Sequence, residues 1–593
     1  MRSFENPASQ VAEAPEAGRE GRSTPLLPEN RRVNRITGHL LLALLAGICT
    51  FGEWTGAAAQ PSSSPPTKGQ AENAILREKR STDLLYVNGR GNGHQRSCDT
   101  LAGEDCFGGQ FECHACGRFP TRGQMIQLGE AHDALAELVA RAQPGVTTEL
   151  LDWVAGQRAG VWTRMGAEER AREAVDECVA SAWWCVALRG FVEHNAGQYV
   201  LAESYFREAL AAMPEDLACY WNELVLYHDT LGPSAGHRGG RSHCAPLEAY
   251  DAFWTIADPL FSQPGNERMT EHYARHVDMR IHSQWLTIRN GHHPLTHHSE
   301  VLRYGWPTGW EDWSGRRHMI FGRGGQGFLV LAPVEDALRA GSSLFEPVSQ
   351  GATETFRARF GIMTALPIQT GFFRRNGRPV LVARSTDPAG TNVASQQWTV
   401  HAWNGSGFAT APAEVEKEHD QLTAWLDVPW EPQIVSLEAV HDSGALRART
   451  GTDPPDSTGA VVVSSLVILD NEYGTPASLE EAVRRMQPRT TIEAGTPVSA
   501  FWEVYTARPL HATIEFTTTS TARRNFFARL FGGGAGPARR VRWTEEWVPA
   551  DGVVRRSFGL DIDRLPPGPY ELLLSITPDE GSVLSTSIRI VVE

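Results

Sequence analysis

The sequence predicts a multidomain α+β protein in which an α-helical N-terminal part is followed by β-rich C-terminal domains. Its 593 residues exceed what one hydrophobic core supports. From about residue 125 to 286, apolar residues recur at intervals of three and four, which is the period of packed helices. From about residue 356 onward the period changes to two between Gly and Pro turns, which indicates strands.

The first 59 residues are typical of a secretory signal peptide. Three arginines at 31–35 precede an apolar run at 36–51, and small residues follow at 57–59. Basic, apolar and then small residues are the order of a cleavable signal. The apolar run is about 16 residues long, against roughly 20 for a membrane span, and an uncleaved anchor is the alternative. We expect residues 1–59 to direct export to the periplasm or the extracellular space, with membrane association as a further option.

The cysteines support export. Cleavage would remove Cys49 from the nine cysteines and leave eight, all before residue 250. An even set in an exported protein indicates disulfides, and we expect the local pairs Cys98–Cys106, Cys178–Cys185 and Cys219–Cys244, with Cys113 and Cys116 remaining. A zinc site is the alternative, with Cys98, Cys106, Cys113 and Cys116 as ligands. Zinc ribbons usually have two C-x-x-C pairs, and this segment has one.

These signals divide the chain into consecutive regions. A Pro- and Ser-rich stretch at 61–70 belongs to a linker, which we assign to 60–95. The segment SLEEAVRRM at 478–486 predicts one short helix. The remaining regions are a disulfide-containing helical domain at 96–310, a mixed connecting region at 311–364, a β-sandwich-like domain at 365–487, and a C-terminal immunoglobulin-like β-sandwich domain at 488–593.

One helical segment, at 183–216, carries a spaced set of small and aromatic residues. Small Ala202 and Ala209 would let two antiparallel helices approach, Phe206 would fill the groove between them, and Pro214 would end the second helix. This spacing resembles the tetratricopeptide repeat. The resemblance implies a short array of tetratricopeptide-like helix pairs, because neighbouring windows match poorly.

Two short catalytic motifs occur in unsuitable surroundings. GPSAG at 232–236 fits the G-x-S-x-G nucleophile motif with Ser234, but a helix-like stretch precedes it where a strand is required. GRGGQG at 322–327 fits the dinucleotide-binding pattern, but a strand-like segment follows it where a helix is required. We therefore assign no catalytic or cofactor-binding residue. The formal net charge of −15 argues against a general nucleic-acid binder, which needs a basic face.

The segment ERMTEHYARHVDMRIH at 267–282 raises the question of a metal site. His272 and His276 are four residues apart, the spacing of a helical metal pair, but Tyr-Ala-Arg stands between them where a zinc protease has a glutamate. A stripe with a period of four is typical of a core-facing helix side, and one runs through the segment and just beyond it, at Met269, Tyr273, Val277, Ile281 and Trp285. We favour a packed helix without metal. A metal-dependent hydrolase that uses His272 and His276, with a third ligand from 291–298, is the alternative.

A longer run of marked residues spans about 250–310. It has an aromatic-Trp start, an Asp-Pro step, an Asn-Glu pair, an acidic helix with arginine and a later Arg-Tyr-Gly-x-Pro, here Phe253, Trp254, Asp258, Pro259, Asn266, Glu267, Glu271, Arg275, Arg303, Tyr304, Gly305 and Pro307. This run resembles the GWxTD-domain family of exported bacterial proteins. The resemblance implies an envelope protein with C-terminal β-sandwich domains and no assigned reaction.

The segment RRNFFARLFGGGAGPARRVRW at 523–543 interrupts the last β domain with six arginines and three phenylalanines. A basic aromatic hairpin can lie on an anionic membrane or a partner surface, and a solvated hairpin is the alternative. We expect partner contacts through Arg523, Arg524, Phe526, Phe527, Arg529 and Phe531. Together these features predict an exported, non-enzymatic binding or scaffold protein of the bacterial envelope, without cofactor or nucleic-acid partner and with peripheral membrane contact through 523–543.

Overall fold

The computed structural model describes residues 65–88, 122–142, 145–222, 248–283, 302, 309–313, 316–320, 359–360, 362–386, 397–416, 421–441, 444–455, 459–470, 474–521, 539–579 and 581–593. The chain divides into two units, Met1–Ser64 and Pro65–Glu593, and the first lies wholly outside the described residues. The predicted signal peptide lies in that first unit. None of the described helices is long and apolar enough to cross a membrane.

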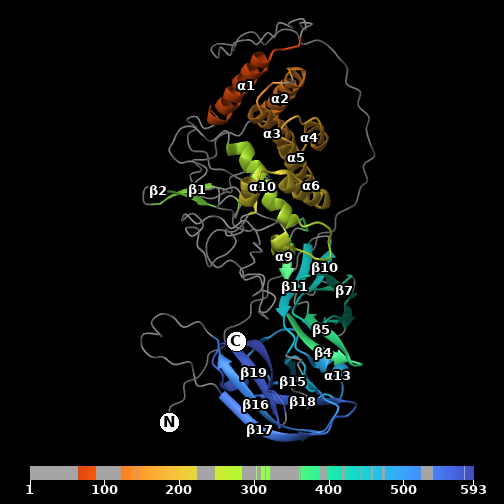
Figure 1. The fold of residues 1–593 in the computed structure, drawn as a ribbon. Coiled ribbons are helices and arrows are strands. Elements are labelled where there is room, and N and C mark those ends of the chain that lie inside the picture. The colour runs from red at the N-terminus through yellow and green to blue at the C-terminus, as the bar shows by residue number, and fades with distance from the viewer. Residues whose placement is uncertain are drawn as a thin grey trace, which may run out of the picture. The chain divides into compact units, whose positions relative to one another are not determined.

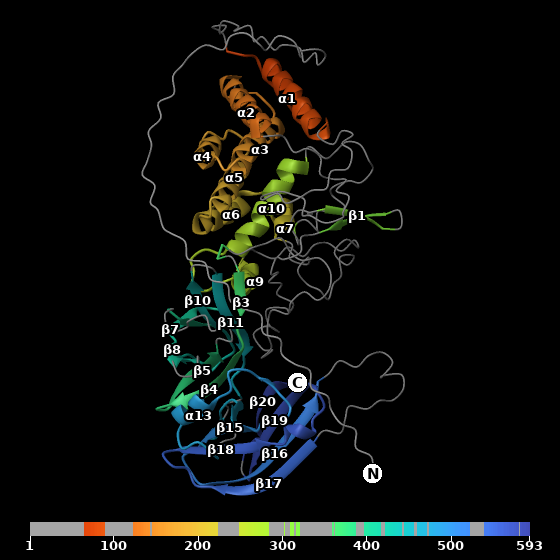
Figure 2. The same ribbon diagram turned by 180° about the vertical axis from the view of Figure 1, so that it is seen from behind.

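Within the second unit the described elements begin with helices and end with β-sheets, which confirms the α+β prediction (Figures 1 and 2). The helices of the first half are α1 (Lys68–Asn88), α2 (Arg122–Ala142), α3 (Thr148–Arg164), α4 (Glu168–Asp176), α5 (Ala182–Asn195), α6 (Tyr199–Ala212), α7 (Glu215–Trp221), α9 (Glu248–Ala257) and α10 (Glu267–Ser283).

Helix α1 lies inside the segment 60–95 that the sequence predicts as a linker, so the structure differs from that prediction. Ala71 and Ile75 are fully buried and share a small core with Leu135 of α2 and Trp153 of α3. These two apolar residues lie one helical turn apart and form a narrow stripe. Charged and polar neighbours surround the stripe, and it is too short to stand out by periodicity.

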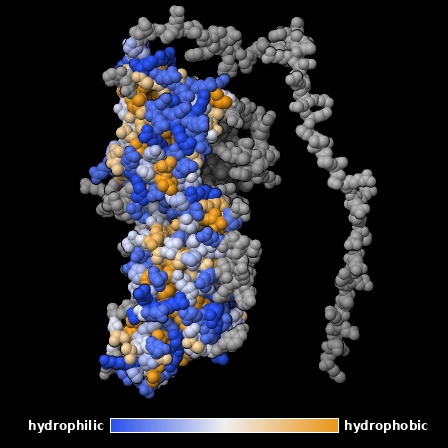
Figure 3. All heavy atoms as spheres, turned by 90° about the vertical axis from the view of Figure 1, so that its right-hand side faces the viewer, coloured by the Kyte–Doolittle hydropathy of each residue, from blue (hydrophilic) through white to orange (hydrophobic). Residues whose placement is uncertain are grey.

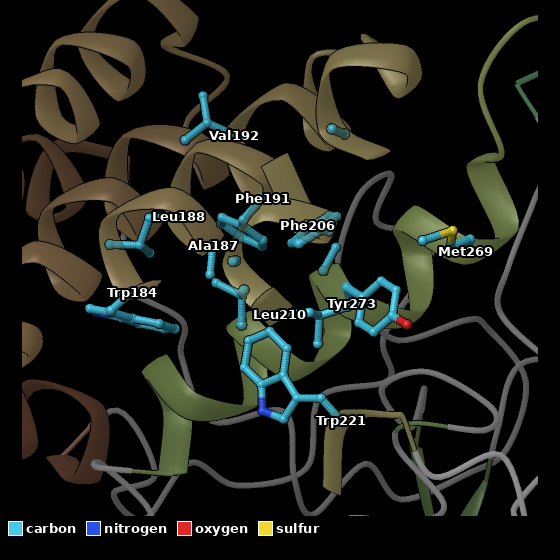
Figure 4. Close-up of a cluster of buried hydrophobic side chains, with 14 of the residues drawn as sticks. Trp184, Ala187, Leu188, Phe191, Val192, Phe206, Leu210, Trp221, Met269 and Tyr273 are labelled. Carbon is cyan, nitrogen blue, oxygen red and sulfur yellow. The ribbon is translucent and has the colours of Figure 1, made fainter. Parts of the chain in front are cut away.

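Helices α5 and α6 pack along one another across a tight turn at 196–198, as the spacing at 183–216 predicts. Phe206 is fully buried, and a Cβ atom added at Gly190 would come 2.8 Å from its ring. Ala202 and Ala209 are also fully buried. Figure 4 shows Phe206 in the cluster that α5, α6 and α10 share. Small residues therefore set the close approach of the two helices.

A two-stranded hairpin, β1 (Gly309–Trp313) and β2 (Arg316–Ile320), lies within and just before the predicted connecting region. The first larger group of strands forms two sheets, with orders β3-β11-β10-β6-β7 and β4-β5-β9-β8. Leu381 of β5 and Leu437 of β10 belong to one buried cluster, so the two sheets share a core. The strands are β3 (Ile362–Ala365), β4 (Ile368–Arg375), β5 (Arg378–Thr386), β6 (Thr399–Trp403), β7 (Phe408–Pro412), β8 (Glu414–Glu416), β9 (Gln421–Asp427), β10 (Gln433–His441) and β11 (Gly444–Thr452).

The second group also forms two sheets, one with order β12-β15-β13 and β18 beside β15, the other with order β14-β20-β19-β16-β17. Trp502 of β15 and Ile514 of β16 share its core. The strands are β12 (Val462–Val463), β13 (Val467–Asp470), β14 (Thr491–Ile492), β15 (Val498–Tyr505), β16 (Leu510–Ser520), β17 (Arg539–Trp547), β18 (Val553–Leu560), β19 (Gly568–Pro578) and β20 (Leu584–Val592). Strands β12 and β13 come from the predicted 365–487 region but pair with β15, so that region contributes to both groups.

The short helix predicted at 478–486 is present as α13 (Leu479–Arg485). The Ser478 Oγ atom accepts the Glu481 backbone N–H at 3.1 Å, which caps the first turn. Its buried residues Leu479 and Val483 share a core with Phe373 of β4. A serine followed three residues later by glutamate is a known sequence signature of a helix start.

The disulfide predicted between Cys178 and Cys185 is present and joins the end of α4 to α5. Cys219 is also disulfide-bonded, and its partner is outside the described part of the chain. The other cysteines of the predicted framework, Cys98, Cys106, Cys113, Cys116 and Cys244, lie outside the described residues.

Candidate functional site

Helix α10 carries most of the candidate residues, and its first turn is fixed by Asn266. The Oδ1 atom of Asn266 accepts the Met269 backbone N–H at 2.8 Å, and its Nδ2 donates to the Trp254 carbonyl at 2.6 Å. The preceding Gly265 has a φ of +84°, and a Cβ there would come 2.7 Å from the Val200 backbone nitrogen. Helix α10 therefore starts at a defined point against α6 and α9.

One side of α10 is hydrophobic and buried, as the four-residue period predicts. Met269, Tyr273 and Val277 are completely buried, and Ile281 is 1% exposed. Tyr273 also donates its hydroxyl to Asn222 Oδ1 at 2.7 Å, next to the end of α7. Figure 4 shows Tyr273 on α10 beside Phe206, with Met269 farther along the same helix. Trp285, the last residue of the predicted stripe, lies outside the described residues.

His272 and His276 both lie in the contact between α10 and α7. The His272 Nε2 atom donates to the Trp221 carbonyl at 2.8 Å, because a carbonyl can only accept. Burial lowers the pKa of His272 to about 3, so its ring is neutral at physiological pH. The His276 ring stacks on Trp221 with centroids 5.0 Å apart and meets the His272 ring edge-on at 4.8 Å. Each ring therefore has a packing role in the helix contact.

We expect His272→Ala to destabilise the helical region by about 2–4 kcal/mol, because the change removes a buried ring and leaves a carbonyl without its donor. Chemical denaturation followed by tryptophan fluorescence measures this. His511→Ala is the control: His511 is 52% exposed beside Asp579, and its loss should change stability by about 0.5 kcal/mol or less. Stoichiometric zinc that is lost from a folded His272→Ala variant would instead favour the metal-dependent hydrolase.

The opposite side of α10 holds a carboxylate–histidine–hydroxyl arrangement. His194 of α5 lies with Nε2 2.9 Å from Glu271 Oε2 and Nδ1 3.0 Å from Thr270 Oγ1. Arg275 donates to the other Glu271 oxygen at 2.7 Å. Burial alone would raise the pKa of Glu271, but the charge of Arg275 and the His194 hydrogen bond hold it well below its usual value.

This arrangement has the connectivity of a catalytic triad but not its accessibility. The Thr270 side chain is completely buried, and its hydroxyl donates to the Glu267 carbonyl one helical turn earlier at 3.1 Å. A nucleophile must reach the substrate, and this hydroxyl is directed back to its own helix. The three groups therefore join α5 to α10 and do not present a reactive oxygen.

Glu267, the first residue of α10, is a buried carboxyl with an unusual environment. It is 2% exposed, and its Oε2 atom accepts the Arg359 backbone N–H at 3.3 Å, with Arg359 Nε at 3.5 Å. Its Oε1 atom is buried and makes no hydrogen bond within the described structure. Burial is the main cause that raises the pKa of Glu267 to about 7. A carboxyl with such a pKa is a candidate for proton transfer, and it is also a source of pH-dependent stability.

The raised pKa of Glu267 predicts the direction in which folding stability changes with pH. Its folded pKa of about 7 exceeds the unfolded value of 4.5, so folding binds the proton, and the stability associated with Glu267 falls as pH rises from 4.5 to 7. Glu267→Gln mimics the protonated form and should match the native chain near pH 4.5. Above pH 7 it should be more stable by about 2–3 kcal/mol. Denaturation curves for both proteins between pH 4.5 and 8 measure the difference, and a constant difference would contradict the shift.

A second charged cluster joins the turn after α9 to the first group of sheets. Glu438 of β10 accepts the backbone N–H groups of Phe261 at 3.0 Å and Ser262 at 2.9 Å. Arg449 of β11 donates to Glu438 at 2.9 Å, and its guanidinium lies 3.7 Å from the centre of the Phe261 ring. The side chains of Glu438 and Arg449 are 0% and 1% exposed. This buried ion pair therefore attaches the turn at 256–262 to β10 and β11.

Arginines of β11 also bind the carbonyl groups of the same turn. Arg449 donates to the Ile256 carbonyl at 3.1 Å and the Asp258 carbonyl at 2.6 Å. Arg447 donates to the Pro259 carbonyl at 2.8 Å. Inside the turn, Asp258 Oδ1 accepts the Leu260 N–H at 3.1 Å. We name Asp258, Glu438, Arg447 and Arg449 the junction cluster, because they connect helices to sheets through groups far apart in the sequence.

The structure brings together some predicted residues and leaves others undescribed. Glu267, Glu271, His272, Arg275 and His276 share α10, and Asp258 lies in the junction cluster. Among the described residues, His, Cys, Asp and Glu side chains form no group of three that could hold a metal ion. The motifs at 232–236 and 322–327, the loop at 291–298 and the residues Arg303, Tyr304, Gly305, Pro307, Arg523, Arg524, Phe526, Phe527, Arg529 and Phe531 lie outside the described residues.

His194, Glu438, Arg447 and Arg449 were not identified from the sequence. The strand sequences QIVSLEAVH and GALRARTGT place single charges among apolar or small residues. Charged side chains are rarely buried without partners, so charges inside an apolar strand are a usable signal for a buried ion pair. His194 near the end of a helix carries no comparable signal.

No protein-family model matches this chain, and no curated protein sequence matches it. Structural similarity extends to red sea bream transglutaminase, with 13% identity over 39% of this chain and 31% of that chain and a TM-score of 0.14. It also extends to a DUF3823 family protein from Bacteroides ovatus, with 8% identity over 38% of this chain and 98% of that chain and a TM-score of 0.14. At these values neither similarity supports a functional argument, and the chain spans about a third (31%) of the transglutaminase.

Proposed function

We propose that this chain is an exported, non-enzymatic protein of the bacterial envelope that binds a protein partner or acts as a scaffold for one. In this proposal the α5–α6 hairpin is a tetratricopeptide-like pair, and the two sheet groups are β-sandwich domains, the last of them immunoglobulin-like. The GWxTD-like run supplies internal contacts that hold helices and sheets together. The segment 523–543 adds a surface for a partner or for peripheral membrane contact.

One observation carries the proposal: the charged residues of the run from Asp258 to Arg275 bond to other parts of their own chain. Glu271 binds His194 and Arg275, and Glu267 binds the backbone of Arg359. The turn that contains Asp258 binds Glu438 and Arg449. These charged groups contact α5, the segment at 359–360 and the sheets. A substrate site needs accessible polar groups, so contacts of this kind favour a structural role.

Exposed apolar side chains on the helical part supply a candidate contact surface. Val200 and Leu201 at the start of α6 are 54% and 48% exposed, and Tyr220 on α7 is 39% exposed. On the face drawn in Figure 3, hydrophilic and hydrophobic described residues are interspersed. These exposed apolar positions are where the proposal places the contact with the partner.

Site-specific photo-crosslinking in intact cells tests the proposal. A benzophenone amino acid replaces Leu201 or Tyr220 in the full-length chain, and irradiation is followed by mass spectrometry of crosslinked species. The matched control carries the same amino acid at Val583, which is 56% exposed in the turn between β19 and β20. We expect one discrete crosslinked protein from Leu201 or Tyr220 and none from Val583.

Two results would contradict the proposal. One is the absence of any specific crosslink from the helical positions and from the 523–543 segment. The other is turnover of an ester, peptide or glycan substrate by the purified protein, with loss of that turnover in Glu267→Gln while the fold is retained. The second result would identify Glu267 as a catalytic acid or base.

A further inference from the structure

Strand β17 is the outer strand of the five-stranded C-terminal sheet (Figures 1 and 2). It contains nine residues, and among the described strands it pairs only with β16. Its first four residues, Arg539 to Arg542, are all exposed. Such an edge has backbone N–H and carbonyl groups that can pair with a further strand. Three of the six arginines in the 523–543 segment lie on it.

From Arg540 to Trp543 the side chains of β17 alternate between basic and apolar, and Glu545 and Glu546 follow toward the other end of the strand. Arg540 and Arg542 lie on the outer face, opposite Thr517 and Glu515 of β16, and Arg540 pairs with Glu515 at 3.3 Å. Val541 and Trp543 lie on the inner face, opposite the buried Phe516 and Ile514.

The inner face of this edge is apolar and incompletely covered. The Trp543 ring stacks on Phe558 of β18 with centroids 5.3 Å apart. Val541, one step toward the exposed end of the strand, is 46% exposed. A strand added beside β17 would place every second side chain over Val541 and Trp543, where an apolar residue would extend the existing core.

The outer face of the edge favours acidic side chains on an added strand. Side chains of an added strand would lie beside Arg540 and Arg542, and opposite charges on neighbouring strands stabilise a pair. The whole chain has a formal net charge of −15, so the positive charge of Arg540 and Arg542 is opposite in sign to that of the protein as a whole. The two faces together define an alternating pattern for the added strand, with acidic residues outside and apolar residues inside.

We propose that the edge of β17 accepts an extended segment of a partner protein in which acidic residues alternate with apolar residues. The inference rests on the proposed function as a binding protein and names the chemistry of one partner segment. The bound segment becomes the sixth strand of the sheet β14-β20-β19-β16-β17. Backbone hydrogen bonds supply the pairing, and the alternating side chains supply the selectivity.

A peptide-binding measurement on the purified full-length chain tests the pattern. The probe is a fluorescein-labelled nonapeptide in which Glu alternates with Val or Tyr, and its matched partner has Lys at every Glu position. Fluorescence anisotropy should show binding of the acidic peptide and at least about tenfold weaker binding of the Lys peptide. Equal binding of both peptides, or of neither, would overturn the proposal.

Two N-methylated versions of the acidic probe test strand addition itself. One is methylated on the odd and the other on the even backbone nitrogens. An added edge strand uses the N–H groups of only one of its two sides for pairing. We expect one methylated probe to lose binding and the other to keep it. Loss with both or with neither would overturn strand addition.

Charge reversal on the protein identifies the site. Arg540→Glu combined with Arg542→Glu should weaken the acidic probe by at least about tenfold and strengthen the Lys probe. The control Arg589→Glu changes an arginine on β20 that pairs in register with Glu571 of β19, and it should leave both affinities unchanged. Unchanged affinities in the Arg540/Arg542 variant, or binding to anionic phosphatidylglycerol vesicles instead of peptide, would overturn the proposal. So would a probe-independent dimer that the same variant abolishes, because β17 would then pair with a second copy.

Failure of the β17 proposal can be distinguished from failure of the proposed function. Loss of the β17 site leaves crosslinking from Leu201 and Tyr220 unaffected. Failure of crosslinking at every surface would contradict partner binding as a whole.

Discussion

Replacing Arg449 by alanine is expected to destabilise the folded chain by about 3–5 kcal/mol, since it leaves a buried carboxylate without its cation. Glu438 is completely buried and Arg449 lies 2.9 Å from it. The change also removes the donor to the Ile256 and Asp258 carbonyl groups. Chemical denaturation of the purified chain measures the loss. Arg489→Ala is the matched control, because Arg489 is 50% exposed beside Glu493, and it should cost about 1 kcal/mol or less.

The double variant Arg449→Met with Glu438→Leu distinguishes the contribution of the ion pair to stability from that of its hydrogen bonds to the turn. Replacing both charges by apolar groups removes the penalty of an unpaired buried charge. The double variant should therefore lose less stability than Arg449→Ala alone, and proteolysis within 256–262 should still accelerate because the carbonyl and N–H contacts are gone. If the double variant loses as much stability as Arg449→Met and Glu438→Leu lose together as single variants, the two charges do not interact.

Replacing Phe206 by alanine should have a comparably large effect, about 3–5 kcal/mol, because the ring fills the contact between α5 and α6. The ring is completely buried and lies against Gly190. Phe206→Leu keeps most of the volume and should cost less. Thermal or chemical unfolding followed by tryptophan fluorescence compares the two variants. Equal, small losses would show that the helix pair does not depend on this ring.

Periodicity in the sequence predicted much of the local structure correctly. The stripe at Met269, Tyr273, Val277 and Ile281 is buried. The α13 helix lies at the predicted segment 478–486. These features depend on neighbouring residues, so a local pattern contains enough information to predict them.

Long-range contacts could not be predicted in the same way. Glu438 meets the Phe261 backbone 177 residues earlier, and His194 meets Glu271 across 77 residues. Neither partner constrains the local sequence of the other, and no spacing rule links them. For the same reason the sequence does not predict that β12 and β13 pair with β15 in the second group of sheets, since strand pairing depends on tertiary packing. Helix α1 was missed because its apolar stripe consists of only a few residues.

We propose that the charged run from Asp258 to Arg275 is a structural frame in a binding protein. The most direct measurement compares partner crosslinking from Leu201 in native and Glu267→Gln chains in intact cells, at equal protein abundance. Glu267→Gln keeps the shape of the side chain and the acceptor for the Arg359 N–H. We expect the same crosslinked partner at the same yield from both chains. Loss of the crosslink in a Glu267→Gln chain that remains abundant and folded would contradict a purely structural role for Glu267, because the carboxyl itself would then be required for partner binding.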